Sequence, residues 1–496
     1  MTKRMVLRMS CLVMSVCVVM STAMVASSAG CVVSTGEKRE MNVIIRMMDA
    51  QDRWFRENII KPFEKEYHCK INVVVFDKVT DVETMLEREK TGKHETGLVK
   101  TEAPVLATFK RYMMPLEDVV GKEKMDKDMQ DYVDNALGMG TFDGKVYYIP
   151  RKLEVRTMLY SKSKVADAVG GWGRYEDKIN AAIRETNGYG LPAGYDLESD
   201  PNEWDLFDLF VVSYYWAHTP YFGFKMPRLA HRAKDYEGTT TFLVDRTYQM
   251  GGTQNDVLAM NTDPVIDMFE WEALFKHNKL YNPSMWKERW SGGGIWNAMK
   301  SGSVFLCFMH QIDAFFIHGG SHPTMQGFLA NPNDMGLALM PMGVSLELGE
   351  NGKPLRVGSR RASVTGWWWG IPKTSPNFML SYELARWITN YENHLAECQT
   401  FGMMPIRKDV IGKLEAFPQP WMRDVFEIGH EQLSLPGTEP KPLISQWTDM
   451  SANYRNAWYD IIVGNNYHPK GKKGIDRAYI SEVLDKYAEK NRRILA

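Results

Sequence analysis

The sequence lacks the short motifs that mark common catalytic and nucleotide-binding sites. It contains no H-E-x-x-H zinc motif, no G-x-S-x-G nucleophile turn and no phosphate-binding G-x-x-x-x-G-K-[ST] loop. Its 11 histidines are scattered along 496 residues. With 61 acidic residues, pairs of carboxylates occur throughout the chain and do not by themselves indicate glycoside hydrolysis. We therefore expect a protein that is not an enzyme, with no cofactor and no metal site.

The chain also has almost no net charge and few cysteines. Its formal net charge is -1 and no long run of one sign occurs, whereas nucleic-acid binding requires clustered cations. We therefore expect no nucleic-acid partner. Beyond residue 31 the cysteines are Cys69, Cys307 and Cys398, an odd number at wide spacing. A disulfide framework is therefore not expected.

No segment after the N-terminal region approaches the length of a transmembrane helix. At the N-terminus, Lys3, Arg4 and Arg8 precede the apolar or small residues 11–25. This stretch has about 15 residues, against the roughly 20 that span a bilayer as a helix. A positive start followed by such a segment is typical of a secretory signal peptide. We predict that residues 1–30 are a cleaved leader and that the remaining chain is extracytoplasmic.

Cys31 directly follows small residues at the predicted cleavage point. The run Ser27-Ser28-Ala29-Gly30-Cys31 resembles a bacterial lipobox, with Ser28 where leucine is usual. The resemblance implies that Cys31 carries a lipid and holds the protein on a membrane through a tether at residues 31–40. Each buried methylene of an acyl chain contributes about 0.8 kcal/mol, so two or three chains would hold a soluble domain firmly. An ordinary signal peptide with an incidental cysteine is the alternative.

Hydrophobic periodicity predicts an α/β protein. Apolar runs at 41–46 and 71–76 are typical of strands, and residues 54–67 and 82–89 carry apolar side chains at helical spacing. Strands that alternate with helices indicate a parallel sheet covered by helices. Further strands are predicted at 146–150, 157–160, 301–309, 336–341 and 367–371, and further helices at 179–184, 204–216, 263–278, 377–390 and in the tail at 454–495. The helix at 263–278 is predicted to be amphipathic, and residues 219–255 match no element.

Several segments carry recognisable patterns in one order along the chain. They are residues 141–150 (TFDGKVYYIP) with 158–161, 204–207 (WDLF), 301–309, 366–375 (GWWWGIPKTS) and 401–407 (FGMMPIR). Together they resemble an extracellular solute-binding protein of the carbohydrate ABC transporter group, similar to the maltose-binding type, over about residues 41–430. Ser303 departs from the pattern, because lysine is usual there.

The resemblance implies an α/β fold of the two-lobed periplasmic-binding-protein type, with a ligand cleft between the lobes. Mapped onto this chain, the parts are a first lobe at 41–150 and 305–355, a second lobe at 156–300 and 365–440, and C-terminal helices at 441–496. The chain would cross between the lobes near 150–156, 305–313 and 356–366. Ligands in open α/β sheets bind beyond the carboxyl ends of strands, so site residues are expected in the loops that follow strands.

A sugar presents apolar faces and a ring of hydroxyls, so its site requires aromatic platforms together with fixed donors and acceptors. Trp367 is the favoured platform and Trp368 the next, because alternate side chains of a strand face opposite ways. Most candidates have a structural alternative: core packing for Trp216 and for one of Trp367 and Trp368, surface packing for Trp290, a helix N-cap for Asp49, a mutual or interlobe ion pair for Glu154 and Arg156, and plain solvent exposure for Arg407. The predicted ligand-binding residues are Asp49, Glu154, Arg156, Trp216, Trp290, His310, Asp313, Trp367, Trp368 and Arg407.

These observations predict the lipid-anchored, extracytoplasmic substrate-binding component of an ABC importer. It would bind a sugar or oligosaccharide by closure of the lobes, since a ligand that contacts both lobes favours the closed form. The expected partners are the permease subunits and, through the lipid, the membrane, and the protein is expected to be a monomer. The alternatives are the same fold with a polyamine, peptide or organic anion as ligand, or a surface lipoprotein for sensing or adhesion. A secreted glycoside hydrolase is less favoured.

Overall fold

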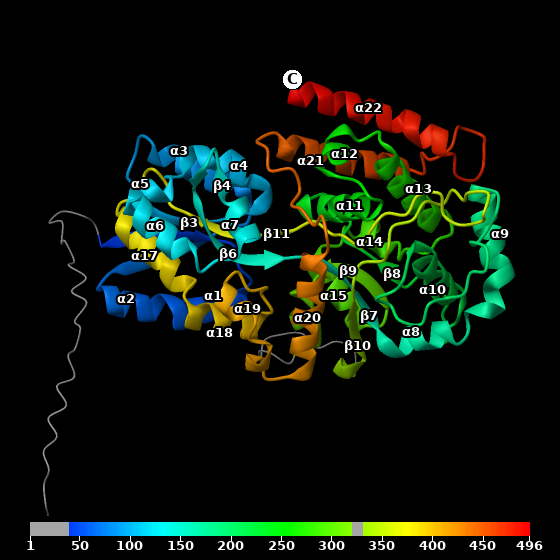
Figure 1. Cartoon of the computed structure of the whole chain (residues 1–496), viewed down its shortest axis with the longest axis horizontal. Coiled ribbons are helices and arrows are strands. Elements are labelled where there is room, and N and C mark those ends of the chain that lie inside the picture. Colours follow the sequence, from blue (N-terminus) through cyan, green and yellow to red (C-terminus); the bar gives the residue numbers. More distant parts are fainter. Residues whose placement is uncertain (1–38, 320–330) are drawn as a thin grey trace, which may run out of the picture. The chain divides into compact units, whose positions relative to one another are not determined.

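The computed structural model describes residues 39–319 and 331–496, which contain two β-sheets that each carry their own helices (Figure 1). The predicted leader and the predicted lipid site at Cys31 lie outside the described residues. None of the helices in the described part of the chain is both long enough and apolar enough to cross a membrane. Cys69, Cys307 and Cys398 are free thiols, as expected from their spacing.

The first sheet is largely parallel on one side and antiparallel on the other. In spatial order its strands are β2 (Lys70–Val75), β1 (Glu40–Ile45), β3 (Thr96–Glu102), β11 (Thr365–Gly370) and β6 (Tyr148–Glu154). β1 is parallel to β2 and β3, whereas β11 is antiparallel to β3 and β6. Val43, Ile44 and Ile45 are consecutive and all buried, because helices cover both faces of this part of the sheet.

The helices of the first lobe come from two separate parts of the chain. They are α1 (Asp49–Phe55), α2 (Lys61–Tyr67), α3 (Val79–Glu89), α4 (Leu106–Phe109), α5 (Leu116–Val120), α6 (Lys122–Met129), α7 (Asp134–Met139), α17 (Phe378–Ile388), α18 (Tyr391–Phe401) and α19 (Lys408–Ile411). α1 and α2 join through a π-helical turn, Arg56–Ile60. Residues 142–145 form a hairpin between β4 (Thr141–Phe142) and β5 (Lys145–Val146), and Asp143 and Gly144 both have positive φ, as a tight hairpin turn requires.

The second sheet is mainly antiparallel. In spatial order its strands are β10 (Met335–Ala338), β7 (Arg156–Ser161), β9 (Leu306–His310) and β8 (Leu229–Ala230). The helices around it are α8 (Lys162–Val169), α9 (Glu176–Asn187), α10 (Leu206–His218), α11 (Glu237–Gln249), α12 (Gln254–Ala259), α13 (Asp263–His277), α14 (Ser284–Lys287), α15 (Gly292–Lys300), α16 (Asp313–His318), α20 (Pro420–Ser434), α21 (Trp447–Trp458) and α22 (Arg477–Leu495).

α11 and α13 lie inside the second lobe, so the predicted amphipathic character of 263–278 is wrong. Every residue of α13 from Val265 to Phe275 is buried, including three acidic side chains. Asp267 accepts two hydrogen bonds from Arg356 at 2.8 Å each. Glu272 accepts one from the Tyr281 hydroxyl at 2.6 Å. Such pairing is what allows a buried helix to keep charged residues.

The structure reverses the predicted lobe assignment of the late strands. β9 and β10, predicted in the first lobe at 305–355, pair with β7 in the second sheet, whereas β11, predicted in the second lobe, lies between β3 and β6 in the first. Residues 305–313 are therefore not a crossing. A short apolar strand carries no local mark of the sheet that it joins, because its partners are distant in sequence. The chain crosses at Val155, again between β10 and β11, and again between α19 and α20.

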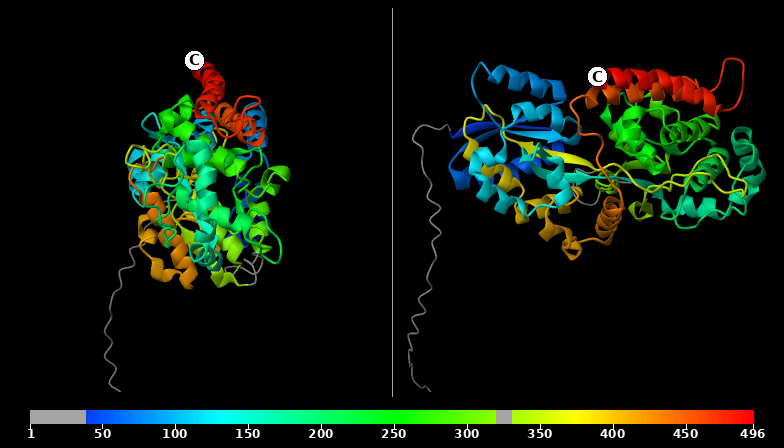
Figure 2. Two further views of the ribbon diagram at one scale, coloured as in Figure 1. Left: turned by 90° about the vertical axis from the view of Figure 1, so that its right-hand side faces the viewer. Right: turned by 45° about the horizontal axis from the view of Figure 1, so that its top comes forward.

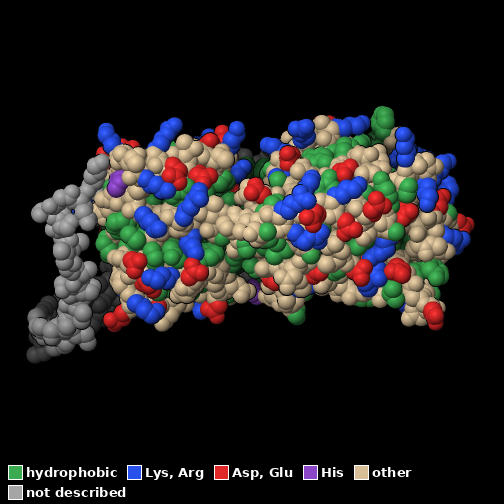
Figure 3. Space-filling view, turned by 90° about the horizontal axis from the view of Figure 1, so that it is seen from above, with side chains coloured by type: hydrophobic (Ala, Val, Ile, Leu, Met, Phe, Trp, Pro, Cys, Tyr) green, Lys and Arg blue, Asp and Glu red, His purple; other side chains and the backbone are tan. Residues whose placement is uncertain are grey.

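The C-terminal residues 441–496 pack on the second lobe as part of it. α21 contacts α11, and α22 contacts α12 and α13; Figure 2 shows the two red and orange helices lying over these green ones. The segment before α21 also reaches the first lobe, where the carbonyl of Ser445 accepts a hydrogen bond from Thr108 Oγ1 at 3.2 Å. On the face drawn in Figure 3, basic and acidic side chains are interspersed, in keeping with the net charge of -1.

Candidate functional site

The crossing from β6 to β7 places charged side chains between the two sheets. Glu154 ends β6, Arg156 begins β7, and Arg156 pairs in register with His310 at the end of β9. Asp313 begins α16 directly after β9. These predicted site residues therefore lie together, with side chains contributed by α11, by residue 232 and by the segment before α21. We call the group the interlobe cluster: Glu102, Lys152, Glu154, Arg156, Arg232, Glu237, Asp245, His310, Asp313 and Lys441.

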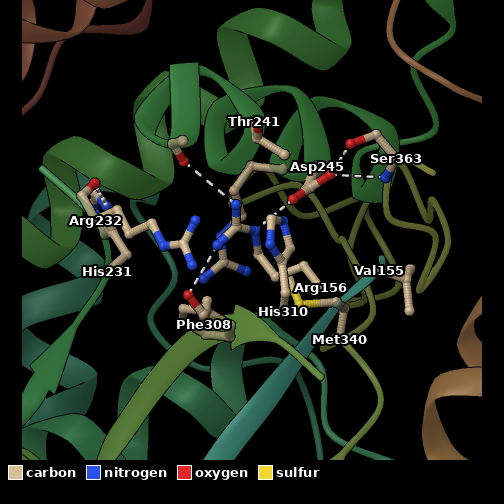
Figure 4. A network of polar contacts seen from close by, with 12 residues as sticks. Val155, Arg156, His231, Arg232, Thr241, Asp245, Phe308, His310, Met340 and Ser363 are labelled. Carbon is tan, nitrogen blue, oxygen red and sulfur yellow. Dashed lines mark hydrogen bonds and ion pairs between the residues drawn. The ribbon is translucent and has the colours of Figure 1, made fainter. Parts of the chain in front are cut away.

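Arg156 is held by a fully buried ion pair with Asp245 of α11 (Figure 4). Arg156 Nε donates to Asp245 Oδ2 at 2.6 Å, and its two terminal nitrogens donate to the carbonyls of Phe308 at 3.0 Å and Gly238 at 3.3 Å. Asp245 also accepts hydrogen bonds from the backbone N–H and the hydroxyl of Ser363 at 2.7 and 2.6 Å. This network ties together the start of β7, α11 and the segment that leads to β11. An ion pair was the alternative role for Arg156, and its partner is Asp245, whereas Glu154 pairs with Lys152.

Asp313 joins a cation, an aromatic ring and the end of β9. Its carboxylate accepts hydrogen bonds from Arg232 Nη2 at 2.9 Å, from Trp296 Nε1 at 2.9 Å and from the backbone N–H of His310 at 3.0 Å. Burial raises the pKa of this carboxyl above its usual range. The half-buried ring of Trp296 stacks on Phe316, with ring centroids 4.9 Å apart and planes 17° apart. An indole held in this way can serve as a rigid platform for an apolar sugar face.

His310 lies between the acidic and the basic members of the interlobe cluster. Its Nδ1 is 3.6 Å from Glu154 Oε2, and Glu154 also forms an ion pair with Lys152. Among the described residues, His310 Nε2 has no hydrogen-bond partner although it is buried. Burial, together with the nearby Arg232 and Arg156, lowers the pKa of this imidazole well below its usual value. The ring is therefore neutral near pH 7.

The first lobe contributes Trp367 and a lysine that the sequence reading did not single out. Trp367 is half-buried and pairs in register with Glu102. The ammonium of Lys100 lies 4.3 Å from the centroid of the Trp367 ring and donates to the Arg46 carbonyl at 2.6 Å. Within residues 39–319 and 331–496, Lys100 forms no ion pair, and burial lowers its pKa well below the usual value. The sequence of β3, TGLVKTE, is too polar to read as a buried strand, so it gave no local signal that Lys100 is buried.

Two other residues predicted as ligand contacts, Trp368 and Trp216, have packing roles in the structure. Trp368 is fully buried in the first lobe and donates to the Ala136 carbonyl at 2.9 Å. Trp216 is buried against Phe305 and donates to the Lys164 carbonyl at 2.9 Å. Both indoles are therefore enclosed by protein, with their N–H groups already satisfied.

Trp290, Arg407 and Asp49 also lie outside the interlobe cluster. Trp290 is buried and donates to Glu288 Oε2 at 2.8 Å. The glycines at 292–294 lie between Trp290 and Trp296, so the sequence alone does not show which of these two tryptophans belongs to the site. Arg407 is buried in the first lobe and pairs with Asp131 and Asp409. Asp49 is exposed in the first turn of α1, where Met48 occupies the N-cap position that was the alternative for Asp49.

The fold and the sequence place the protein in a known group. The sequence profile of the bacterial extracellular solute-binding proteins matches residues 58–421. The chain belongs to this family. The family is non-catalytic, which confirms the prediction that this solute-binding protein is not an enzyme. No protein of curated function matches the chain in sequence.

Solved structures confirm the predicted fold of this solute-binding protein. Maltose-bound MalE3 of T. maritima superposes with a TM-score of 0.66 at 13% identity, covering 92% of this chain and 99% of that one. A solute-binding protein of Thermotoga lettingae with bound α-D-tagatose gives a TM-score of 0.66 at 18% identity, covering 92% and 100%. One from Agrobacterium radiobacter in complex with ribitol gives 0.61 at 13% identity, covering 92% and 98%. At these identities the likeness shows the fold alone.

Proposed function

We propose that this protein is the lipid-anchored substrate-binding component of an ABC importer and that it binds a sugar or oligosaccharide between its lobes. The observation that carries the proposal is the pairing of half-buried tryptophans with fixed polar groups at the crossing. Trp296 in the second lobe is oriented by Asp313, and Trp367 in the first lobe lies beside Glu102. Aromatic faces next to oriented donors and acceptors are what a carbohydrate requires.

The proteins of similar fold support this ligand class. The matched structures hold maltose, tagatose and ribitol, which are sugars or a polyol. The T. lettingae protein is named as an ABC transporter solute-binding protein, and the same assignment for this chain makes permease subunits its partners. The lipid on Cys31 would keep the protein close to those subunits.

Closure of the lobes is the proposed binding step. Val155 alone separates β6 from β7, so a change in a few backbone angles at the crossings can reorient one sheet against the other. A ligand that contacts Trp367 and Trp296 at once bridges the lobes and therefore favours the closed form.

Thermal unfolding of the purified protein with a panel of sugars, polyols and acidic oligosaccharides at millimolar concentration tests the proposal. A ligand present at 100 times its dissociation constant adds about 2.7 kcal/mol to the free energy of unfolding, and the midpoint rises accordingly. We expect such a rise with at least one carbohydrate. The absence of a rise with every carbohydrate, beside a rise with a polyamine or a peptide, would refute the assignment of the ligand and leave the fold intact.

A further inference from the structure

The carboxylates on the second-lobe side of the interlobe cluster are already saturated with hydrogen bonds. Asp245 accepts from Arg156 and twice from Ser363. Asp313 accepts from Arg232, from Trp296 and from the backbone of His310. Glu237 accepts from Lys441 at 2.5 Å, from Trp447 Nε1 at 2.9 Å and from the Ser451 hydroxyl. Little acceptor capacity remains on these groups for a ligand hydroxyl.

Nitrogen atoms of the same group are left without partners. Arg232 Nε and His310 Nε2 are both buried and, among the described residues, neither has a hydrogen-bond partner. Burial, followed by the charges of Arg232, Arg156, Lys441 and Lys152, lowers the pKa of His310, so its ring is neutral and its Nδ1–H faces Glu154. The unused donor of this group is therefore the guanidinium Nε–H of Arg232.

The first-lobe side adds a cation and one free carboxyl. Lys100 is 3% exposed and, among the described residues, has no carboxylate partner. Glu102 has no hydrogen-bond partner there either, and burial raises its pKa, which favours the protonated form. A protonated carboxyl donates a hydrogen bond, whereas an ionised one only accepts. Protonation of Glu102 beside an anion would thus add a further donor.

The hydrogen-bonding chemistry of the ligand follows from this balance. A neutral sugar hydroxyl donates as well as accepts, so a site for neutral sugars must keep acceptors free. A carboxylate or a sulfate ester only accepts, and its hydrogen bonds to cationic donors are the strong, charge-assisted kind. Three nearly filled carboxylates beside the buried, unpartnered Nε–H of Arg232 fit the second kind of group.

We infer that the ligand is an acidic carbohydrate, a uronic acid or a sulfated sugar, whose anionic group binds Arg232 while its sugar rings lie against Trp296 and Trp367. This inference rests on the proposed function, because it takes the region between the lobes as the ligand site. It restricts the proposed carbohydrate ligand to one that carries a negative charge.

Isothermal titration with matched oligosaccharides tests the inference. The ligands are a galacturonic acid oligomer, a sulfated galactose oligomer and a neutral galactose oligomer, all of the same length. We expect one of the two acidic ligands to bind at least about tenfold more tightly than the neutral one, and added salt to weaken it selectively. Preference for the uronate identifies a carboxylate as the bound group, and preference for the sulfated sugar identifies a sulfate ester. Equal or tighter binding of the neutral oligomer would overturn the inference and leave the proposed function standing, whereas loss of all carbohydrate binding would overturn both.

The variant Arg232→Gln tests whether the preference for an acidic ligand comes from Arg232. We expect it to weaken binding of the acidic ligand about tenfold or more and to weaken binding of a neutral oligomer by a smaller factor. Arg184→Gln is the matched control, because Arg184 is an exposed arginine of α9 in the same lobe. If Arg232→Gln proves unstable by its thermal midpoint, Arg232→Lys replaces it, because lysine keeps a cation beside Asp313 but lacks the guanidinium Nε–H, and we again expect weaker binding of the acidic ligand. Unchanged affinity of the acidic ligand in a folded variant contradicts the inference.

Discussion

At the scale of the residue, Arg156 shows how strongly burial decides the role of a charged side chain. Its side chain and that of Asp245 are both completely buried. A buried charge is tolerated only when it is paired and hydrogen-bonded. Arg156 donates hydrogen bonds to the Asp245 carboxylate and to the carbonyls of Gly238 and Phe308. Little of its hydrogen-bonding capacity is left for a ligand. We therefore assign Arg156 to the positioning of the crossing strands and leave binding of the anionic group to Arg232.

His394 makes stability depend on pH. The imidazole is fully buried in α18, its Nε2 accepts the N–H of Ile406 at 3.0 Å, and burial, followed by the charges of Arg151 and Arg407, lowers its pKa to about 3. An unfolded histidine titrates near about 6.5, so below that pH the unfolded chain binds a proton that the folded one does not. The contribution of His394 to stability is therefore complete above about pH 6.5 and is lost as the pH falls toward 3, by about 1.4 kcal/mol per pH unit.

Urea unfolding between pH 4 and pH 7 measures this dependence. We expect His394→Gln to reduce the slope of the unfolding free energy against pH by about 1.4 kcal/mol per pH unit relative to the unmodified protein. This change corresponds to the loss of one proton taken up on unfolding. His430→Gln, at an exposed position of α20, is the control and should keep the original slope. Equal slopes in all three proteins would show that His394 does not remain neutral in the folded state.

Candidate site residues that directly follow strands could be predicted from the sequence. Which tryptophan faces the core and which faces away from it could not. His310 and Asp313 follow β9, and the carboxyl end of a strand is a position that sequence reveals. Which of Trp367 and Trp368 faces away from the core depends on the pairing of β11 with β6, and that pairing shifts register between these two residues. A register shift arises from contacts with a distant strand and has no local signal.

At the scale of the element, β11 depends on a glycine. Gly366 has a φ of +155°, and a Cβ atom there would lie 2.2 Å from the carbonyl oxygen of Lys152 in β6. Any larger residue would push these paired strands apart. We expect Gly366→Ala to lower the free energy of unfolding by about 1–3 kcal/mol, the range for overpacking a filled interior.

Chemical denaturation compares the unfolding free energy of this variant with that of Gly138→Ala, a substitution at a glycine that has open space around it. A Cβ atom at Gly138 in α7 would meet nothing within 4 Å, so Gly138→Ala should stabilise the protein by about 0.5–1 kcal/mol. Opposite signs for the two variants are expected. A neutral Gly366→Ala would mean that β11 and β6 separate without cost.

Elements with clear periodicity were predictable, and buried helices were not. The alternation of β1, α1, β2 and α3 follows from apolar spacing, and the predicted strands and helices there agree with the structure. α11 was unassigned because nearly all of it is buried, so its threonines and charged residues form no polar face. An amphipathic pattern requires solvent on one side, which α11 and α13 do not have.

At the scale of the whole molecule, the predicted anchor determines where the protein works. Metabolic labelling with a radioactive fatty acid is expected to mark the unmodified protein and not Cys31→Ser, and the variant should leave the membrane fraction. Cys69→Ser is the matched control, since Cys69 is a partly exposed thiol of the described chain. Label retained by Cys31→Ser, or absent from the unmodified protein, would leave an ordinary cleaved leader as the explanation.

The position of β11 also governs the order in which the protein can assemble. β3 and β6 are not neighbours in the first sheet, because β11 lies between them and bonds to both. Residues 40–154 therefore cannot complete their sheet until residue 370 has been synthesised. Until then β3 and β6 keep unpaired edges, which are templates for aggregation. The first lobe thus depends on most of the second lobe being made before its own sheet is finished, and such long-range pairing makes folding slow.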